Sequence, residues 1–396
     1  MNKTNAAAQA EYLSSASHSF DYSLAADVVE AARAAAGDVD LIGRFPKEAF
    51  AGLRTHGLLG ALVPQSSGGP GLSLRDAAIH CQSLAAACGS AGMILAMHHI
   101  QVASIVRHAA GSRWHSDFLR RMNEQQLLLA SSTSEVGTGG SLRTSICAIE
   151  ASGDRFSVQK QASAISYGAE ADAILVTTRA QASAPPSDQV LTVLERSGFT
   201  LQKTASWDAM GMRGTGSEGY VLKAEGAVAQ TIPATFAEIS EATMVPVSHI
   251  LWASVWTGIA TDAVLRARGA LRRRRLKEDA SSDALRLGEA VELLQLAEAR
   301  LQTALDRFDW ANPQAASFAR AASSNALKTS VSEACLSVAQ QAMSICGFAG
   351  YARDGEFSVA RHVRDLHSAP LMISNGRMRD AAAQLLLAQR PELGIK

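Results

Sequence analysis

The sequence predicts an α+β protein in which a β-rich middle separates two helical regions. Three observations support this fold class: alanine- and leucine-rich stretches near the N-terminus, short β-branched runs in the middle, and helical apolar spacing over the remainder. We place the three parts at residues 1–126, 127–235 and 236–396. Strands and helices do not alternate along the chain, so the sequence does not predict a Rossmann domain.

The N-terminal region is predicted to be helical. Residues 25–36 are rich in alanine, the strongest helix former, and contain neither glycine nor proline. A second helix is expected to start at Pro46, because proline is well tolerated at the first position of a helix. The proline- and glycine-rich residues 63–71 end it, and two longer helices are expected over residues 73–87 and 90–109.

The sequence changes to short strand-like runs in the middle region. Apolar residues that alternate with polar ones or follow one another directly occur at residues 155–159, 173–178, 189–194 and 219–222. Turn signals separate these runs, among them the two prolines within residues 185–187. Short strands separated by turns predict a small β-barrel or β-sandwich.

The C-terminal region is expected to fold as a four-helix bundle. One continuous apolar stripe follows steps of three and four residues, which is the spacing of a single helix face. The stripe consists of Leu287, Val291, Leu294, Leu301, Leu305 and Phe308. A stripe of this length with few loops indicates helices that pack side by side.

Composition and charge argue against several classes of function. The chain has 37 basic and 37 acidic residues, so its net charge gives no support for nucleic-acid binding. Its apolar runs fall short of the roughly 20 residues that a membrane span needs. Residues 1–19 are polar and alanine-rich, without the apolar core of a secretory signal.

The five cysteines form no C-x-x-C pair and are odd in number. This usage is typical of reduced, buried thiols rather than of a disulfide framework or a zinc site, so no metal is expected. Cys81 and Cys88 lie one heptad apart in a predicted helix and are interpreted as core residues. We therefore expect a cytoplasmic protein.

Residues 206–217 are the most informative segment of the chain. They lie between strand-like runs and carry three glycines within residues 211–216, together with Arg213. Glycine admits positive φ and lets the backbone approach a ligand closely. Taken alone, the segment is equally consistent with an irregular connection between strands.

Together with three other segments in the same order, this loop resembles the acyl-CoA dehydrogenase superfamily of flavoproteins. The four segments are residues 58–73, 134–141, 207–217 and 345–365. The second is similar to the T-E-P-G-A-G-S-D loop of the family, and the fourth ends in the family's Arg-Asp pair. The similarity covers roughly residues 25–390. It implies an N-terminal helical domain, a central β domain and a C-terminal four-helix bundle.

The resemblance also implies a bound FAD. By position, Ser134 matches a residue that hydrogen-bonds the flavin, and Ser166 replaces a flavin-contacting threonine. A run of four arginines is usually a solvated helix face, but its member Arg274 matches an arginine that reaches the FAD pyrophosphate of a neighbouring subunit. The family's following Phe-Gly is replaced at residues 276–279, and Gly347 stands in an altered Gly-Gly pair.

The segment at residues 134–141 suits a flavin or a phosphate on physical grounds as well. Its three glycines expose backbone N–H groups, which donate to the polar edge of a flavin ring or to phosphate oxygens. The substrate is then expected beside Gly140, Ser141 and Ile373, in a pocket that also borders Ser166.

The catalytic carboxylate of the family is missing from both of its usual positions. Acyl-CoA dehydrogenases need a base for the α-proton of the substrate while the β-hydride passes to the flavin. Most members carry a glutamate about eight residues after the Arg-Asp pair, where this chain has Ile373. Other members carry it on the first long helix of the C-terminal domain, where this chain has Ser248.

Three alternatives follow for the chemistry. Glu238 or Glu241 acts as a displaced base, or His367 does acid–base work, because histidine titrates near neutral pH. Monooxygenases of the superfamily also lack the glutamate and often place a histidine near this segment. In the third alternative the protein has lost its chemistry and keeps a flavin or an interaction role.

These features lead to one expected function and one close alternative. We expect an FAD-dependent oxidoreductase that oxidises an acyl thioester and passes electrons to a partner protein. The alternative is a two-component monooxygenase that uses oxygen and reduced flavin from a flavin reductase. In either case the resemblance implies a homodimer or homotetramer that assembles through the bundle, with no membrane or nucleic-acid partner.

Overall fold

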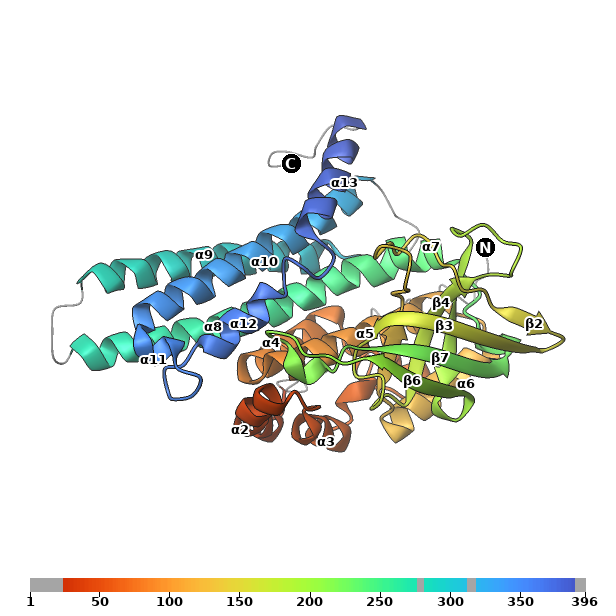
Figure 1. Ribbon diagram of the computed structural model, residues 1–396, viewed down its shortest axis with the longest axis horizontal. Coiled ribbons are helices and arrows are strands. Elements are labelled where there is room, and N and C mark those ends of the chain that lie inside the picture. The colour runs from red at the N-terminus through yellow and green to blue at the C-terminus, as the bar shows by residue number, and fades with distance from the viewer. Residues whose placement is uncertain (1–23, 276–280, 312–317, 389–396) are drawn as a thin grey trace.

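The computed structural model describes residues 24–275, 281–311 and 318–388. The long C-terminal helices run along the molecule, with the N-terminal helices beside their middle and the strands at one end (Figure 1). The N-terminal segment 1–19 and the altered residues 276–279 lie outside the described residues.

Among the described residues, five α-helices form the N-terminal region, and four of them lie where the sequence predicted helices. Helix α4 begins after Ser73, whose side chain forms a capping box with Asp76. The first helix runs six residues beyond the predicted end at Ala36, and the last has no counterpart in the predicted pattern. The helices are α2 (Ala26–Ile42), α3 (Lys47–Thr55), α4 (Leu74–Ala87), α5 (Gly89–His108) and α6 (Arg113–Gln125).

Helix α5 lies in the centre of the protein. Among the described helices it alone is long and apolar enough to cross a membrane, but 89% of the tested window is buried inside the protein, which is typical of a core helix. His98 on this helix donates through Nε2 to the Leu59 carbonyl (2.8 Å) and accepts through Nδ1 from the Leu129 N–H (3.0 Å). Burial lowers the pKa of His98 to about 4, so it is a neutral core residue.

The central region contains two small sheets. The strands are β1 (Leu129–Ser132), β2 (Glu150–Ser152), β3 (Arg155–Ile165), β4 (Ala173–Arg179), β5 (Gln189–Glu195), β6 (Phe199–Ala205) and β7 (Glu218–Ala227). One sheet has the order β1-β4-β5, with β1 and β4 parallel, and the other has the antiparallel order β2-β3-β7-β6. Strand β3 alternates buried and exposed residues, as expected for a sheet with one covered face.

A buried lysine connects the two sheets. Lys160 of β3 donates from Nζ to the carbonyl of Ser132 (2.9 Å) and to both oxygens of Thr177 (2.7 and 2.9 Å). All three N–H groups of its ammonium are therefore used, which offsets the cost of burying the charge.

The C-terminal region is a bundle of three long helices whose fourth place is divided between two shorter ones. Helix α8 packs against both α4 and α10, so it joins the N-terminal helices to the bundle. The elements are α7 (Phe236–Ile239), the π-helical turn η6 (Ser240–Met244), α8 (Val245–Arg275), α9 (Ser281–Arg307), α10 (Phe318–Cys346), α11 (Phe348–Tyr351), α12 (Ala360–His367) and α13 (Asn375–Ala388).

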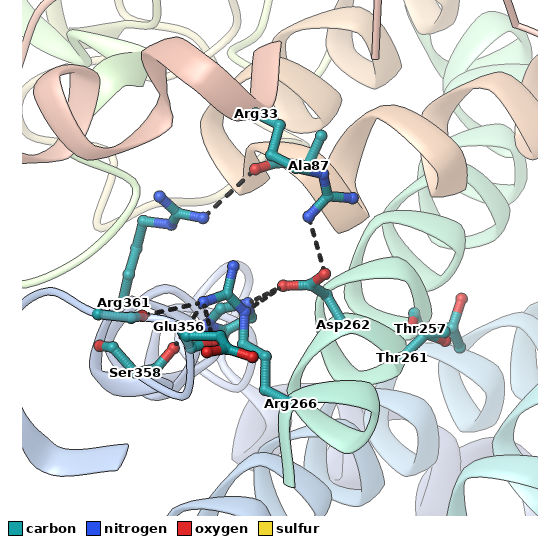
Figure 2. Close-up of polar contacts among 11 residues, drawn as sticks. Arg33, Ala87, Thr257, Thr261, Asp262, Arg266, Glu356, Ser358 and Arg361 are labelled. Atoms are coloured by element: carbon teal, nitrogen blue, oxygen red, sulfur yellow. Dashed lines mark hydrogen bonds and ion pairs between the residues drawn. The ribbon is translucent and has the colours of Figure 1, made fainter. Parts of the chain in front are cut away.

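A buried carboxylate of α8 links this helix to the N-terminal helices, as the contact between Asp262 and Arg33 shows (Figure 2), and also to α12. Asp262 of α8 accepts from Arg33 of α2 (2.9 Å), Arg266 (2.7 Å) and His362 of α12 (2.8 Å). Burial by itself raises the pKa of Asp262, but the His362 hydrogen bond and the Arg266 charge outweigh it and hold the pKa well below its ordinary value. Asp262 is therefore ionised and satisfied at neutral pH.

Candidate functional site

The two most informative sequence segments, residues 207–217 and the Arg-Asp pair, interlock. The backbone N–H of Met212 donates to Asp365 Oδ1 (2.6 Å), and Arg364 Nη1 donates to the Met210 carbonyl (2.8 Å). Between these contacts, a Cβ at Gly211 would lie 2.1 Å from the Arg364 carbonyl oxygen. The glycine is therefore required by close backbone approach within the chain.

Arg213 also forms hydrogen bonds with other residues of the chain. It donates from Nε to the Asp40 carbonyl near the end of α2 (2.7 Å) and from Nη1 to Asp208 (2.9 Å) and the Ala209 carbonyl (2.9 Å). Arg213 therefore holds the loop against the N-terminal helices, so its presence is explained by a structural role.

The segment at residues 134–141 forms a glycine-rich loop at the end of β1. Gly137, Gly139 and Gly140 have φ values of 94°, 62° and 76°. Only glycine adopts such angles readily, so the loop curls more tightly than a strand. Ser134 fixes its start: its hydroxyl donates to the Ala164 carbonyl (2.9 Å) and accepts from the Ala164 N–H (3.2 Å).

A buried carboxylate and an arginine of the bundle hold the rest of this loop. Glu135 accepts from the Ser145 hydroxyl (2.8 Å) and from the N–H groups of Ile146 (3.0 Å) and Cys147 (2.7 Å). Arg377 of α13 donates to the Gly139 carbonyl (2.6 Å), so the loop lies against the bundle. The predicted substrate residues Gly140 and Ser141 lie in this loop, and Ser141 accepts from the Arg143 N–H (3.2 Å).

Ser166 is the first donor in a chain of hydroxyl groups, in which each hydroxyl donates its proton to the next. Thr215 donates its proton to the Met212 carbonyl (2.8 Å), so Thr215 Oγ1 accepts from Ser217 (2.9 Å), and Ser217 in turn accepts from Ser166 (2.8 Å). Each hydroxyl has one proton. The proton of Ser166 is thereby used, and Ser166 presents only lone pairs to a ligand.

These residues fit a flavin ring. The glycine-rich loop offers backbone polar groups and Ser166 offers an acceptor, and β3 brings the two together because Ser134 bonds Ala164 two residues before Ser166. A flavin carries both ring N–H donors and carbonyl acceptors at its polar edge, so both kinds of protein group have a counterpart.

Arg274, predicted to reach an FAD pyrophosphate, is engaged within its own chain. Its guanidinium forms an ion pair with Asp283 (3.1 Å) and donates to the Ile345 carbonyl. The side chain of Arg274 is 43% exposed to solvent. Gly347 follows in a positive-φ turn (60°) between α10 and α11. Arg274 and Gly347 therefore lie at the same end of the bundle, but Asp283 partly neutralises the arginine.

The two positions of the family carboxylate are occupied by groups without acid–base chemistry. The Ser248 hydroxyl of α8 donates to the carbonyl of Met244 (2.5 Å), the last residue of η6. Ile373 lies between α12 and α13 with φ of 50°, which is unfavourable for a β-branched residue. Its carbonyl accepts from Lys328 of α10 (2.8 Å), which also donates to Asn375 Oδ1 (2.7 Å). Lys328 therefore holds this strained turn.

Of the candidate acid–base residues, the structure brings Glu241 to a cavity. Glu241 lies exposed in the π-helical turn η6, and π-turns inside helices are frequent at functional sites. Glu238 instead caps α7, where its carboxylate accepts from the N–H and hydroxyl of Thr235 (2.9 and 2.8 Å). His367 ends α12 and is not among the residues that line the cavity.

This cavity has a volume of about 840 Å³ and lies where the three regions meet. Its wall combines the loop at Leu142 and the start of β5 at Gln189, the π-helical turn η6, and the ends of α9, α10 and α13. It is large enough for a small organic substrate. Ser141 adjoins it, whereas Ile373 does not line it.

A helical domain, a β domain and a helical bundle, with residues 207–217 interlocked with Arg364 and Asp365, define the acyl-CoA dehydrogenase-like fold. The family model for the acyl-CoA dehydrogenase N-terminal domain matches residues 23–126, and that for the C-terminal domain matches residues 243–376. Together they cover more than half of the chain. The protein belongs to the acyl-CoA dehydrogenase superfamily, as the four sequence segments predicted.

One curated relative shares measurable sequence identity with the chain. It is the amino sugar nitrososynthase DnmZ of Streptomyces peucetius, 28% identical over 193 residues, which are 47% of this chain and 46% of that protein. The chain thus matches about half of the length of this relative.

Solved structures with this fold include enzymes of different reaction types. TdsC of Paenibacillus sp. A11-2, with FMN bound, has a TM-score of 0.80, 17% identity and 98% coverage of both chains. KijD3 in complex with dTDP has a TM-score of 0.78 and 20% identity, over 91% of this chain and 94% of that one. Butyryl-CoA dehydrogenase of Megasphaera elsdenii has a TM-score of 0.77 and 17% identity, over 93% and 99%. These likenesses establish the fold.

Sequence reasoning missed several residues of the site. Glu135 and Lys328 are buried charged residues, and only their type inside apolar stretches signals a role. His249 of α8 also went unnoticed; it is fully buried and contacts Ser324 at the cavity wall. No linear spacing connects residues that meet only when α8, α10 and α13 pack together.

Proposed function

We propose that the protein is a flavin-dependent monooxygenase that takes reduced flavin from a partner reductase and uses oxygen. One observation carries the proposal: Ser248 and Ile373, at the two positions of the family's base, offer a hydroxyl bonded within its helix and a backbone carbonyl bonded to Lys328. Proton abstraction next to a thioester carbonyl needs a positioned base. Oxygen transfer does not need a base at these positions.

The hydroxyl chain that begins at Ser166 supports the use of reduced flavin. Ser166 offers lone pairs only, because its proton goes to Ser217. Reduction adds an N–H donor to the flavin ring, and Ser166 would offer its lone pairs to such a donor. When bound, reduced flavin supplies the two electrons that activate oxygen. The chain's own residues orient the ring and hold the substrate beside it.

The relatives support the same reaction class. The curated relative is named as a nitrososynthase of amino sugars, and one TdsC structure is described as a dibenzothiophene monooxygenase. The first name describes a nitroso product of an amino sugar, and the second describes a monooxygenase of a sulfur heterocycle. We therefore propose nitrogen or sulfur in a small substrate as the atom that is oxygenated.

We further propose FMN as a better ligand than FAD. The pairing of Arg274 with Asp283 and the Ile345 carbonyl reduces the charge that it offers to a pyrophosphate. FMN has no pyrophosphate and does not need this arginine. We also propose a cytoplasmic homodimer or homotetramer, supported by large exposed apolar side chains on α9 such as Leu285 (68% exposed) and Leu296 (63%).

A dehydrogenase that uses Glu241 as a displaced base is the second candidate. Glu241 is the carboxylate that lines the cavity from η6, beside the start of the helix that carries Ser248. In this candidate the substrate is an acyl thioester and the electron acceptor is a separate protein.

Anaerobic flavin binding and oxygen consumption test the proposal. We expect the protein to bind reduced FMN more tightly than oxidised FMN, and to consume oxygen when a flavin reductase and NADH are present. Ser217→Ala removes the acceptor of the Ser166 proton and is expected to reduce the preference for reduced flavin, with Ser330→Ala as a control on an unrelated hydroxyl of α10. Reduction of bound flavin by acyl-CoA without oxygen, abolished by Glu241→Gln, would instead establish the second candidate.

A further inference from the structure

The β domain buries two oppositely charged side chains beside the glycine-rich loop of residues 134–141. Lys160 of β3 is fully buried, and Glu135 of the loop is 7% exposed. Neither side chain forms an ion pair in the described part of the chain, so neutral groups of the protein bind each of them. Replacing a buried charge pair by apolar residues often costs no stability. The fold alone therefore does not explain why both charges are present.

Lys160 holds the chain where it enters the loop. Its ammonium donates to the carbonyl of Ser132 (2.9 Å), the last residue of β1, and its other two N–H groups are bonded to β4. The next residue of β3, Gln161, accepts through its carbonyl from the Val136 N–H (2.9 Å). Strand β3 therefore fixes the backbone on both sides of Ser134, the predicted flavin contact.

Glu135 holds the chain where it returns from the loop. Its carboxylate accepts from the Ser145 hydroxyl and from the N–H groups of Ile146 and Cys147 (2.8, 3.0 and 2.7 Å). Between these two attachments lie three glycines with positive φ. Glycine loses more conformational freedom than any other residue when it becomes ordered. Fixing both ends of the loop before a ligand binds reduces the entropy that is lost on binding.

The charge of Lys160 depends on pH just above neutrality. Burial lowers the pKa of Lys160 to about 8, and the two titratable groups that act on it, Glu135 and Cys147, oppose this shift. Burial raises the pKa of the Cys147 thiol to about 11, so this thiol is neutral up to pH 9. Strands β1 and β4 present carbonyl and hydroxyl oxygens, which do not titrate in this range. Lys160 is therefore charged at pH 7 and loses its charge as the pH rises through about 8.

We propose that Lys160 and Glu135 are positioning residues of the flavin site, which together hold the glycine-rich loop in the conformation that binds the ring. This inference rests on the proposed function only in taking residues 134–141 to bind flavin. Without its third proton, the Lys160 amine has two N–H groups for three acceptors, and Glu135 lacks the neighbouring positive charge. The loop is then held less firmly, so flavin affinity should fall as Lys160 loses its charge.

Flavin titration across pH tests this role in the full-length protein. The probes are FMN and FAD, followed by the change in flavin fluorescence, and the tighter ligand is used throughout. We expect the affinity of the parent to fall by up to about tenfold between pH 7 and pH 9, because one pKa unit corresponds to a tenfold change. Lys160→Met should bind flavin about tenfold more weakly at pH 7 and should lack this fall. Lys223→Met, on the exposed face of β7, is the matched control and should keep the affinity and pH profile of the parent.

Glu135→Gln gives a second measurement that keeps the lysine in place. Glutamine retains an acceptor for the groups at residues 145–147 but removes the charge that raises the pKa of Lys160. The midpoint of the pH profile should therefore move to lower pH, which loss of a merely structural contact would not cause. Glu225→Gln at an exposed position of β7 is the control, with no shift of the midpoint expected. If Lys160→Met does not fold, the midpoint in Glu135→Gln decides.

The outcomes separate this inference from the proposed function. Unchanged flavin affinity in folded Lys160→Met, equal midpoints in Glu135→Gln and the parent, or no flavin binding by the parent overturns it. The expected pH profiles together with absent oxygen consumption would retain the positioning pair and reject the monooxygenase. Oxygen consumption with a flavin affinity that does not depend on Lys160 would retain the monooxygenase and reject the pair.

Discussion

At the scale of single residues, burial of Asp365 has a measurable consequence. Asp365 is buried where it accepts from the Met212 N–H, and burial raises its pKa to about 6 from an ordinary 3.8. The folded protein therefore retains this proton at pH values where the unfolded chain has lost it. Ionisation of Asp365 lowers the free energy of unfolding as pH rises from about 4 to above 6.

Asp365→Asn removes this ionisation and keeps the acceptor for Met212. We expect the free energy of unfolding of the variant, relative to the parent, to increase by about 2–3 kcal/mol between pH 4 and pH 7. Urea unfolding across this pH range measures the difference. Parallel pH profiles for the two proteins would show that Asp365 titrates normally in the folded state.

A second prediction for a single residue concerns Lys328. It supports the strained Ile373 turn through two hydrogen bonds, and its ammonium lies over the Trp256 ring at 5.8 Å. Lys328→Met keeps most of the side-chain volume but leaves the Ile373 carbonyl and Asn375 without their donor. We expect a loss of about 2–4 kcal/mol in the free energy of unfolding, measured in urea. The control, Lys223→Met on the exposed face of β7, should change it by less than about 0.5 kcal/mol.

The candidate site was only partly predictable from single residues. Ser134, Gly140, Ser141 and Ser166 were placed in a common site from the sequence, and the structure puts them in or beside one loop. Their roles as flavin or substrate contacts stay predictions. The carboxylate at Glu135 was not singled out, because a sequence does not show that a charge will be buried.

At the scale of elements, residues 207–217 show that one motif can indicate a ligand site and also be explained by contacts within the chain. The loop resembles a flavoprotein signature, and each of its key groups also has a partner within the chain: Gly211 at Arg364, Met212 at Asp365 and Arg213 at Asp40. The structural interpretation, left open by the sequence, therefore accounts for Gly211 and Arg213 without a ligand.

Gly211→Ala tests the close approach. Its Cβ would lie 2.1 Å from the Arg364 carbonyl oxygen, a backbone atom that cannot move without displacing α12. We expect the variant to lose at least about 2 kcal/mol in the free energy of unfolding. Gly288→Ala in the exposed part of α9 meets no atom within 4 Å and should instead gain about 0.5–1 kcal/mol. If the two variants have equal stability by urea unfolding, the interlock does not constrain Gly211.

The strands that the sequence predicted are present in the structure, but the sequence did not predict all the strands. Strands β3, β4, β5 and β7 coincide with the predicted runs, because their apolar alternation is local. Strands β1, β2 and β6 were missed: β2 has three exposed residues and β6 is mostly exposed, so neither has an apolar signature. The predicted four-helix bundle did not specify its last helix, and beyond α10 the described chain has the short helices α12 and α13, separated by the turn that carries Ile373.

At the scale of the whole molecule, the three regions are joined by contacts that no local pattern reveals. The superfamily resemblance and the α+β class were both confirmed, because four motifs in order constrain the fold more than any one of them. The electrostatic links between regions lay beyond prediction. Asp262 and its partners Arg33 and His362 are separated by more than 200 and by 100 positions, so only the packed fold brings them together.

The Asp262 cluster predicts how the whole protein responds to acid. Because its folded pKa lies below the ordinary value, its stabilisation is complete above about pH 4 and is lost as pH falls through the folded pKa. Asp262→Asn leaves Arg33 and Arg266 without their carboxylate, so we expect it to lower the free energy of unfolding by about 3 kcal/mol at pH 7. At pH 3 the carboxyl is largely protonated in the unfolded parent chain but still ionised in the folded one, so only part of the stabilisation is lost and the difference should shrink without vanishing. Asp154→Asn in the exposed turn before β3 is the control, with no change expected at either pH. A constant difference between pH 7 and pH 3 would mean that Asp262 acts through packing, whereas a shrinking one would show that the ionised carboxylate stabilises the contact between the N-terminal helices, α8 and α12.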